Sequence, residues 1–302
     1  MPKLDDIASF VAVAAAGSIS AAARRTNLSK SVVSARLAVL EEELGARLFH
    51  RTTRRLSLTE DGAAFLENAR RIVREVEDAV AEMAERRGEL AGPMRISAPV
   101  TFGRMHLGPA LYPFLARHPA IALTLELDDR RVDAAADGFD AVIRHGRIED
   151  SRLVAWTLAR SQRVLVASPA YLARHGRPQR PQDLAGHRAL YYMNRGVADW
   201  RFLGEDAADL ARPVAALRVN NGDMMRDAAL AGMGLAMLPS FIVGPDIRAG
   251  ALAVVDIGRQ VEPEFLFVAH PEGRKVSAKL RAFVECLRGA FGEPPYWEAD
   301  AG

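Results

Sequence analysis

Hydrophobic positions near the N-terminus recur at the spacing of amphipathic helices, and small polar residues or glycines separate the segments. The first helical stripe ends before Gly17 and consists of Leu4, Ile7, Phe10, Val11 and Ala14. Ser18 can cap a short second helix over residues 20–25, and Ser29 can cap a third that ends at Leu44. A short helix, a tight turn and a longer capped helix predict a helix-turn-helix.

The pattern changes after the third helix. Residues 49–58 predict two very short strands around a basic, hydroxyl-bearing turn, which would be a wing beside the helices. Thr59 can cap a long helix whose apolar residues follow a heptad-like seam of Phe65, Ala69, Ile72, Val76 and Met83. We expect this seam to form a homodimer interface, with a helix docked on its own domain as the alternative.

Strand-like and helix-like segments alternate beyond Gly92 and predict an α/β body. The expected helices include one over residues 100–117 and one near residues 131–137. The predicted organisation is a winged helix-turn-helix over residues 1–59, a dimerising linker helix over 60–91, and a larger domain over 92–302.

Composition narrows the class of protein. The chain has 302 residues, 49% of them hydrophobic, and carries 40 Lys and Arg against 38 Asp and Glu, so its net charge is +2. Its single cysteine, Cys286, excludes an intramolecular disulfide framework. We find neither a secretory signal nor an apolar run long enough to span a membrane, and we therefore expect a cytoplasmic protein.

The small net charge conceals a basic segment. Residues 24–55 contain eight basic and three acidic residues, a local net charge of +5. A recognition helix presents its first turns to base edges, and a basic wing suits phosphates or the minor groove. The predicted DNA-binding residues are Ser29, Lys30, Ser31, Val32, Ser34, Arg36, Arg51, Thr52, Thr53, Arg54 and Arg55. A small helical bundle without a ligand is the alternative.

The predicted winged helix-turn-helix, residues 1–59, resembles that of a known family. The run FVAVAAAGSISAAARRTNLSKSVVSARLAVLEEELGARLFHRTTRRLSLTEDG is similar to the winged helix-turn-helix of LysR-type transcriptional regulators. In the body, the segments RISAPVTFGRMHLGPAL, FDAVIRHG and ALAGMGLAMLPSFIV resemble the effector domain of the CrgA-like branch. The resemblance covers nearly all of residues 4–290.

The resemblance implies a two-lobed, periplasmic-binding-protein-like effector domain. Lobe I would comprise about residues 92–163 and 269–302, and lobe II about 164–268, with crossings near 164–168 and 265–270. It also implies promoter DNA, a small-molecule effector and a homo-oligomer, either a tetramer or a larger ring, with RNA polymerase as a possible partner. The sequence departs from the family at Lys30, where a Gln is usual, and at Ala35, where a basic residue is common. Lys30 suits phosphate or guanine, so the operators of relatives need not apply.

The effector site is expected at strand ends and helix starts of the body. Its predicted residues are Thr101, Phe102, Arg144, Gly146, Tyr192, Trp200 and Asn221. Most of these residues have a structural alternative. Asn221 can simply cap a helix, Arg144 can pair with an acid, and the aromatic residues can belong to the core.

Two function classes compete. The first is a ligand-responsive, sequence-specific DNA-binding regulator. The second is an α/β enzyme or small-molecule-binding protein whose helical head serves only assembly. The seven histidines are scattered, and the sequence contains no HExxH, CxxC, GxGxxG or GxxxxGK[ST] motif. We therefore favour the regulator, with no catalytic residues, metal or cofactor.

Overall fold

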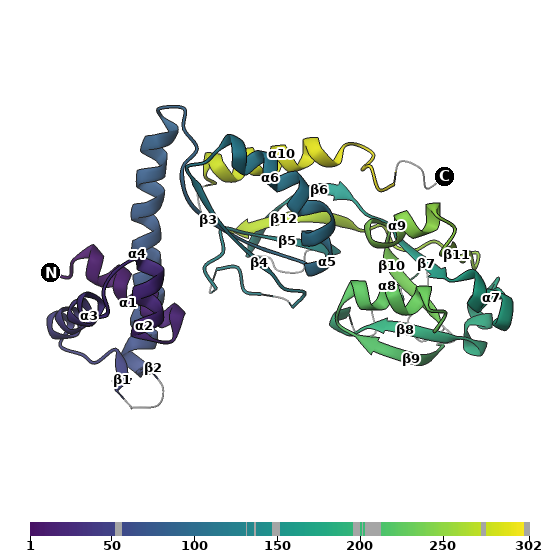
Figure 1. Ribbon diagram of the computed structural model, residues 1–302, viewed down its shortest axis with the longest axis horizontal. Coiled ribbons are helices and arrows are strands. Elements are labelled where there is room, and N and C mark those ends of the chain that lie inside the picture. Colours follow the sequence, from purple (N-terminus) through teal and green to yellow (C-terminus); the bar gives the residue numbers. More distant parts are fainter. Residues whose placement is uncertain are drawn as a thin grey trace. The chain divides into compact units, whose positions relative to one another are not determined.

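The computed structural model describes residues 1–51, 56–130, 132–135, 137–146, 152–195, 200, 202, 213–272 and 276–298, with only the backbone of Arg51. The chain divides into two compact units, Met1–Gly92 and Pro93–Gly302. Both are drawn in Figure 1.

The first unit is a helical head with a small hairpin and a long helix (Figure 1). Its elements are α1 (Leu4–Ala16), α2 (Ile19–Thr26), α3 (Lys30–Leu44), β1 (Phe49–Arg51), β2 (Leu56–Leu58) and α4 (Glu60–Glu85). Side-chain oxygens of Ser18, Ser29 and Thr59 accept backbone N–H groups at the starts of α2, α3 and α4. These caps satisfy donors that a helix start leaves unpaired, so local sequence fixes all three boundaries.

Phe10 lies at the centre of the head core. It is fully buried, and its ring centroid lies 5.4 Å from that of Phe49 in β1 and 5.5 Å from that of Phe65 in α4. Ala69 is also fully buried in this cluster, and Ile72 packs against it. The first half of α4 therefore completes the core of its own unit.

The second unit contains two five-stranded sheets. The first has the order β4-β3-β5-β12-β6, with β3 (Gly92–Ala98), β4 (Ile121–Leu127), β5 (Ala141–Gly146), β6 (Leu153–Arg160) and β12 (Phe265–Pro271). The second has the order β11-β7-β10-β8-β9, with β7 (Arg163–Ala167), β8 (Arg188–Tyr192), β9 (Val214–Val219), β10 (Leu235–Pro239) and β11 (Ala253–Val254). We call them lobe I and lobe II.

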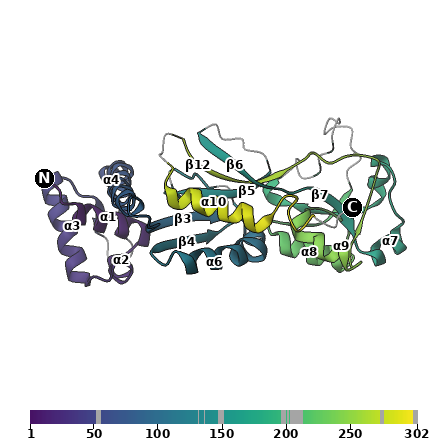
Figure 2. The ribbon, with the colours of Figure 1, turned by 90° about the horizontal axis from the view of Figure 1, so that it is seen from above.

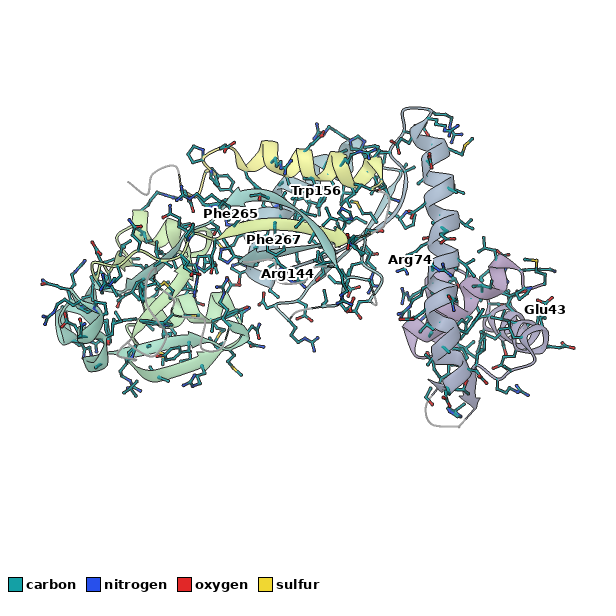
Figure 3. The ribbon with its side chains drawn as sticks, turned by 180° about the vertical axis from the view of Figure 1, so that it is seen from behind. Glu43, Arg74, Arg144, Trp156, Phe265 and Phe267 are labelled. Carbon is teal, nitrogen blue, oxygen red and sulfur yellow. The ribbon has the colours of Figure 1, made fainter. Side chains whose placement is uncertain are left out.

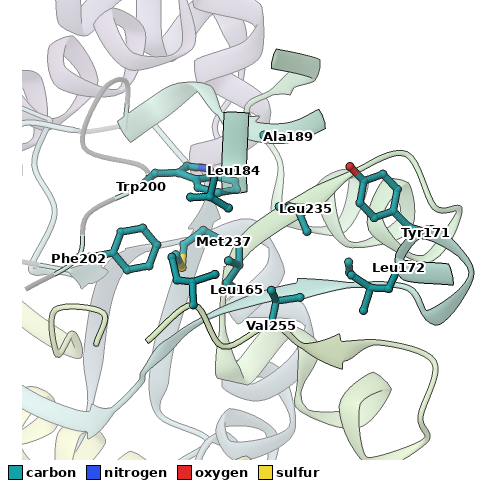
Figure 4. Close-up of a cluster of buried hydrophobic side chains, with 12 residues drawn as sticks. Leu165, Tyr171, Leu172, Leu184, Ala189, Trp200, Phe202, Leu235, Met237 and Val255 are labelled. Carbon is teal, nitrogen blue, oxygen red and sulfur yellow. The ribbon is translucent and has the colours of Figure 1, made fainter. Parts of the chain in front are cut away.

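Helices cover both sheets. In lobe I, α6 (Gly108–Arg117) and α10 (Ala278–Phe291) pack together, with the rings of Phe114 and Phe283 5.8 Å apart, and both lie along the same sheet in Figure 2. Lobe II carries α7 (Pro169–His175), the 3₁₀ turn Pro181–Gly186, α8 (Gly222–Leu230) and α9 (Ser240–Arg248). Its core joins Leu165 and Met237 of the sheet to Tyr171 of α7 and to Trp200 (Figure 4).

The chain passes between the lobes twice. The first passage, Arg160–Arg163, joins β6 to β7, and the second precedes Phe265. Both fall a few residues earlier than the crossings placed from the sequence. Strand β12 pairs with β5 over Phe265–Ala269 and with β6 over its whole length. Phe265–Pro271 therefore belongs to lobe I, and the expected limit of lobe II at residue 268 is wrong.

Two expected helices differ in the structure. The segment from Val100 to Arg117 is divided into α5 (Val100–Phe102), a π-helical turn (Gly103–Leu107) and α6. The helix expected near residues 131–137 is wrong, because the described residues of that segment, 132–135 and 137, form turns and irregular backbone. The overall architecture nevertheless confirms the fold class expected from the sequence.

The C-terminal residues bind to both lobes. Trp297 is almost completely buried beside Phe102 of lobe I and Phe241 of lobe II. A carboxylate oxygen of Glu298 accepts the backbone N–H of Gln162 at 2.7 Å and the hydroxyl of Ser240 at 2.8 Å. This segment is therefore a third link between the lobes.

Candidate functional sites

The start of α3 presents a continuous polar surface. Ser29, Lys30, Ser31, Val32 and Ser34 are all exposed, while Val33, Leu37 and Leu40 of the same helix are buried in the head. The Ser29 hydroxyl caps the helix and lies 2.8 Å from that of Ser31. One face of α3 thus anchors the helix, and the other offers an ammonium, hydroxyls and a small apolar group.

Arg36 differs from the other predicted contacts. Its guanidinium donates to a carboxylate oxygen of Asp5 at 2.7 Å and to Ser9 at 3.5 Å, and its side chain is only 28% exposed. Arg36 therefore ties α3 to α1 in this structure and positions the helix instead of offering a free guanidinium.

The wing is held by a buried carboxylate that sequence reasoning missed. Glu41 accepts the backbone N–H groups of Leu48 at 2.9 Å and Phe49 at 3.3 Å, and it pairs with Arg47 at 3.1 Å. It therefore fixes the approach to the hairpin. Its place in a run of three glutamates gave no sign that it is the buried one.

The hairpin pairs Phe49 with Leu58 and Arg51 with Leu56. The predicted DNA contacts Thr52, Thr53, Arg54 and Arg55, and the side chain of Arg51, lie outside the described residues. Gly62, at the start of α4, sits directly under the backbone of Leu48, where a Cβ would collide with the Leu48 carbonyl. The glycine is required for α4 to lie against the hairpin.

The predicted dimer seam divides into two parts. Phe65, Ala69 and Ile72 pack into the head core, which is the docked alternative considered for this helix. Val76 and Met83 are 38% and 55% exposed, and Val80 between them is 66% exposed. Of the predicted seam, only the residues in the second half of α4 are exposed to solvent.

A pocket of about 580 Å³ lies between the lobes of the second unit. Five of the predicted effector residues line it: Thr101, Phe102, Arg144, Gly146 and Tyr192. Arg144 lies on β5, in register with Phe267 of β12 (Figure 3). The strand ends and helix starts of both lobes thus meet around one space.

Two predicted effector residues lie elsewhere. Trp200 belongs to the hydrophobic core of lobe II (Figure 4), because its ring packs against Tyr191 with centroids 5.8 Å apart. Asn221 caps α8, since its side-chain oxygen accepts the N–H of Met224 at 3.0 Å. For both residues the structure favours the structural alternative, and the next residue, Gly222, is the one that lines the pocket.

An ionic network crosses the pocket. Arg195 of lobe II makes two hydrogen bonds, of 2.6 and 2.7 Å, to the carboxylate of Glu264 and approaches Nδ1 of His145 at 3.3 Å. Nε2 of His145 lies 3.3 Å from the carbonyl oxygen of Ser161 in the first passage. The network links both passages to β5 and to lobe II.

The protonation states of this network follow from burial. Burial lowers the pKa of His145 to about 4, although the charge of Glu264 acts in the opposite direction. Burial alone would raise the pKa of Glu264, but the hydrogen bonds from Arg195 bring that pKa below its ordinary value. At neutral pH the site holds an Arg195–Glu264 ion pair beside an uncharged imidazole. Sequence reasoning missed Arg195 and Glu264, because no local pattern marks them.

The start of α5 is already occupied by carboxylates of the chain itself. The carboxylate of Asp129 accepts the N–H of Val100 at 2.9 Å, and Thr101 donates its hydroxyl to Asp223 at 3.1 Å. Arg104 also binds Asp223, at 2.7 Å. The Val100 N–H and the Thr101 hydroxyl are therefore both engaged within the chain.

Two further observations concern metal sites and membrane-spanning helices. No group of three or more His, Cys, Asp or Glu residues suited to a metal ion occurs among the described residues. Within the same residues no single helix is long and apolar enough to cross a membrane; α1 and α2 reach the threshold only as a pair, bent by 119°.

Comparison with known proteins gives matches over both units. Residues 4–63 match the family model described as "Bacterial regulatory helix-turn-helix protein, lysR family", and residues 87–292 match the one described as "LysR substrate binding domain". An HTH-type transcriptional regulator of Xanthomonas campestris is 37% identical over 290 residues, which cover 94% of this chain and 84% of the relative. The regulator CrgA of Neisseria meningitidis serogroup C is 33% identical over 291 residues, covering 95% and 97%.

Solved structures agree. CrgA from Neisseria meningitidis superposes with a TM-score of 0.59 at 31% identity, over 94% of this chain and 97% of that one. A full-length variant of AphB has a TM-score of 0.65 at 24% identity, over 95% and 99%, and supports the fold alone. With a family model covering more than half of the chain and relatives above 30% identity matching nearly all of it, the chain belongs to the LysR family of transcriptional regulators, and its second unit is the effector-binding domain of that family.

Proposed function

We propose that this LysR-family protein binds specific promoter sequences through the start of α3 and the wing, and that a small molecule in the inter-lobe pocket controls this binding. The observation that carries the proposal is the exposed face of α3, with Lys30, Ser31 and Ser34 presented together in the first turns of a helix whose other face is buried. Such a helix start is suited to base edges in the major groove.

The proposed unit of function is a homodimer or a larger assembly, either a tetramer or a ring. The exposed side chains of Val76, Val80 and Met83 follow one another at helical spacing on α4 and can pair with the same helix of a second copy. A dimer would place two copies of α3 on two half-sites. Promoter DNA as the partner implies a cytoplasmic location and leaves RNA polymerase as a possible contact.

The control mechanism would be a change in lobe separation. The pocket is lined from both lobes, and Arg195 and Asn194 of lobe II bond to residues of lobe I across it. A ligand that binds one separation better than another shifts the population toward it. In an oligomer that shift would alter the spacing of the heads.

The test is binding to the DNA upstream of the gene that encodes this chain, measured by fluorescence anisotropy at physiological salt. We expect that DNA to bind more tightly than a scrambled fragment by a factor of about 10³ or more. Lys30→Ala should cost about 1–3 kcal/mol on the specific fragment, with a smaller loss on the scrambled one. The matched control is Arg87→Ala, which removes one positive charge at the exposed far end of the same unit.

Equal affinity of the wild type for both fragments would refute sequence-specific binding. Equal losses for Lys30→Ala on both fragments would assign Lys30 to phosphate contact alone. An equal loss for Arg87→Ala would show that net charge, not the surface of α3, sets the affinity.

A further inference from the structure

We infer that the inter-lobe pocket takes a zwitterionic α-amino acid with an apolar side chain, whose ammonium meets Asp129 and whose carboxylate meets Arg144. This inference rests on the proposed function of the pocket as an effector site. It follows from which charged residues of the pocket wall already have a partner of opposite charge.

Most of the charged residues that line the pocket already have partners within the chain or are uncharged at neutral pH. Arg195 and Glu264 form a two-point ion pair. Arg163 is buried and donates to the carbonyl oxygen of Met237 at 2.7 Å, and Glu262 has partners of its own. His145 is uncharged at neutral pH, because burial lowers its pKa to about 4. Asp129 and Arg144 remain.

Arg144 is a partly buried cation whose hydrogen bonds go to uncharged oxygens. Its Nη1 donates to the carbonyl of Ile143 at 2.7 Å, and its Nη2 donates to the hydroxyl of Ser97 at 2.9 Å and to the carbonyl of Arg130 at 3.2 Å. Within the described residues these bonds use three of the five N–H groups of a guanidinium. Burial lowers the pKa of Arg144, so a carboxylate brought to it would relieve an unfavourable desolvation.

Asp129 is the complementary anion. One of its carboxylate oxygens accepts the Val100 N–H, and the other, Oδ2, receives no donor from the described part of the chain. Burial raises the pKa of Asp129, and this effect outweighs the opposing effects of the Val100 N–H and the Arg144 charge. An ammonium group on Oδ2 would supply one.

Asp129 and Arg144 influence each other electrostatically, and Asp128 also acts on Arg144, but the hydrogen bonds of the guanidinium go to neither carboxylate. Each is held by backbone: Asp129 by Val100, and Arg144 by the carbonyls of Ile143 and Arg130. A simple anion at Arg144 would be repelled by Asp129, and a simple cation at Asp129 would be repelled by Arg144. A ligand with both charges close together satisfies both residues.

Apolar side chains make up much of the remaining wall, beside the polar residues Thr101, Tyr192 and Asn194. Phe102, Val142, Met237, Phe241, Ile242 and Phe267 all line the pocket. The volume of about 580 Å³ lies within the range of small-molecule sites and exceeds what a charged head group alone would occupy. The apolar wall therefore calls for a hydrocarbon or thioether side chain on the zwitterion.

The test uses the full chain and a set of matched ligands in isothermal titration calorimetry. L-leucine, L-methionine and L-phenylalanine are each compared with the acid that lacks the amino group and with the amine that lacks the carboxyl group. We expect at least one amino acid to bind about tenfold or more tightly than both of its partial analogues, since each removes one charge-assisted hydrogen bond. The inference is wrong if none of the three binds, or if a deaminated acid binds as tightly as its parent.

Two variants assign the charges. Asp129→Asn keeps an oxygen for the Val100 N–H and should remove the preference over the acid, while Arg144→Gln should remove the preference over the amine. Asp140→Asn is the control, because Asp140 also accepts a backbone N–H, from Arg95 at 2.7 Å, but does not line the pocket. The assignment would be overturned if Asp129→Asn kept the preference of the wild type for the amino acid over the acid. It would also be overturned if Asp140→Asn changed that preference as much as Asp129→Asn does. If a variant fails to fold, the ligand series on the wild type still decides.

The outcome is separable from that of the proposed function. A protein that binds its DNA specifically but prefers no amino acid refutes only this inference. A protein that binds an amino acid as described but no specific DNA refutes only the regulator proposal.

Discussion

Replacing His145 by glutamine should make the second unit less sensitive to acid. His145 has its imidazole among Arg195, Glu264 and the Ser161 carbonyl, and burial holds its pKa at about 4. A histidine in the unfolded chain has a pKa of about 6.5. The unfolded state therefore binds more protons than the folded state between these two values, and stability falls as the pH is lowered through that window.

The size of the effect follows from the shift. The contribution of uncharged His145 to the free energy of unfolding is fully present above about pH 6.5. Because each pKa unit corresponds to about 1.4 kcal/mol, the complete loss of this contribution below pH 4 approaches about 3 kcal/mol. Between about pH 8 and about pH 5 the expected loss is about 2 kcal/mol. His145→Gln lacks this titration, so its free energy of unfolding should fall by about 2 kcal/mol less over the same interval.

The assay is urea unfolding followed by tryptophan fluorescence at both pH values. All three tryptophans, Trp156, Trp200 and Trp297, lie in the second unit, so the signal reports that unit without the head. His106 and His187 also have a pKa lowered by burial and add a slope of the same sign. The quantity that matters is therefore the difference between wild type and variant.

The control is His118→Gln, the same substitution at the end of α6, outside the network. The change that His118→Gln makes is the baseline with which the effect of His145→Gln is compared. If His145→Gln lowers stability by the same amount at both pH values, His145 does not titrate as its burial implies, and the reasoning about the network is refuted.

Three further predictions concern other parts of the chain. Gly62→Ala should destabilise the head by about 1–3 kcal/mol, because its Cβ would collide with the Leu48 backbone; urea unfolding by far-UV circular dichroism measures this, and an unchanged profile would contradict the contact. Val80→Asp should dissociate the oligomer while leaving the head folded, as judged by analytical ultracentrifugation; an unchanged mass would exclude this half of α4 from the interface. Gly146→Ala should cost about 1–3 kcal/mol in tryptophan-monitored unfolding, because φ is +115° there and the Cβ would lie 2.9 Å from Arg195; full stability would mean that this turn is not constrained.

The head could be predicted closely because its signals are local. The caps at Ser18, Ser29 and Thr59 bind N–H groups only three residues ahead, and the stripe of α3 follows one helical period. The contact that Arg36 makes inside the head has the opposite origin. Its partner, Asp5, is 31 residues away, and no short-range pattern could show that the guanidinium is engaged.

The difference between local and long-range contacts also explains which features of the effector-binding domain could be predicted. A continuous helix over residues 100–117 was a fair expectation from hydrophobicity, but His106 in the π turn binds the carbonyl of Phe241 and the hydroxyl of Tyr296, which are 135 and 190 residues away. Among the pocket residues found from sequence, Thr101 lies in the short helix α5 directly after β3, and Gly146 ends β5. Asp129, Arg195 and Glu264 acquire their roles only when distant segments meet.

The linker helix shows how one periodicity can serve two surfaces. The seam of α4 keeps its spacing from Phe65 to Met83, so sequence alone assigns it to a single interface. The structure gives the first half to the head core and leaves the second half exposed, because the head is shorter than the helix. Spacing indicates which side chains share a face but not what covers it.

The anchoring of the C-terminal segment bears on how the protein should be handled in the laboratory. Because the Glu298 carboxylate holds both Gln162 and Ser240, and Trp297 is buried beside them, a purification tag or fluorescent fusion joined directly after this segment would pull on the link between the lobes. The N-terminal Met1 is fully exposed, and its amino group reaches only Glu43 at 3.4 Å, although a tag there adds bulk to the DNA-binding head. For ligand titrations the tag therefore belongs at the N-terminus. For DNA titrations it belongs at the C-terminus, behind a long flexible spacer. For quantitative work on both, the tag should be removed.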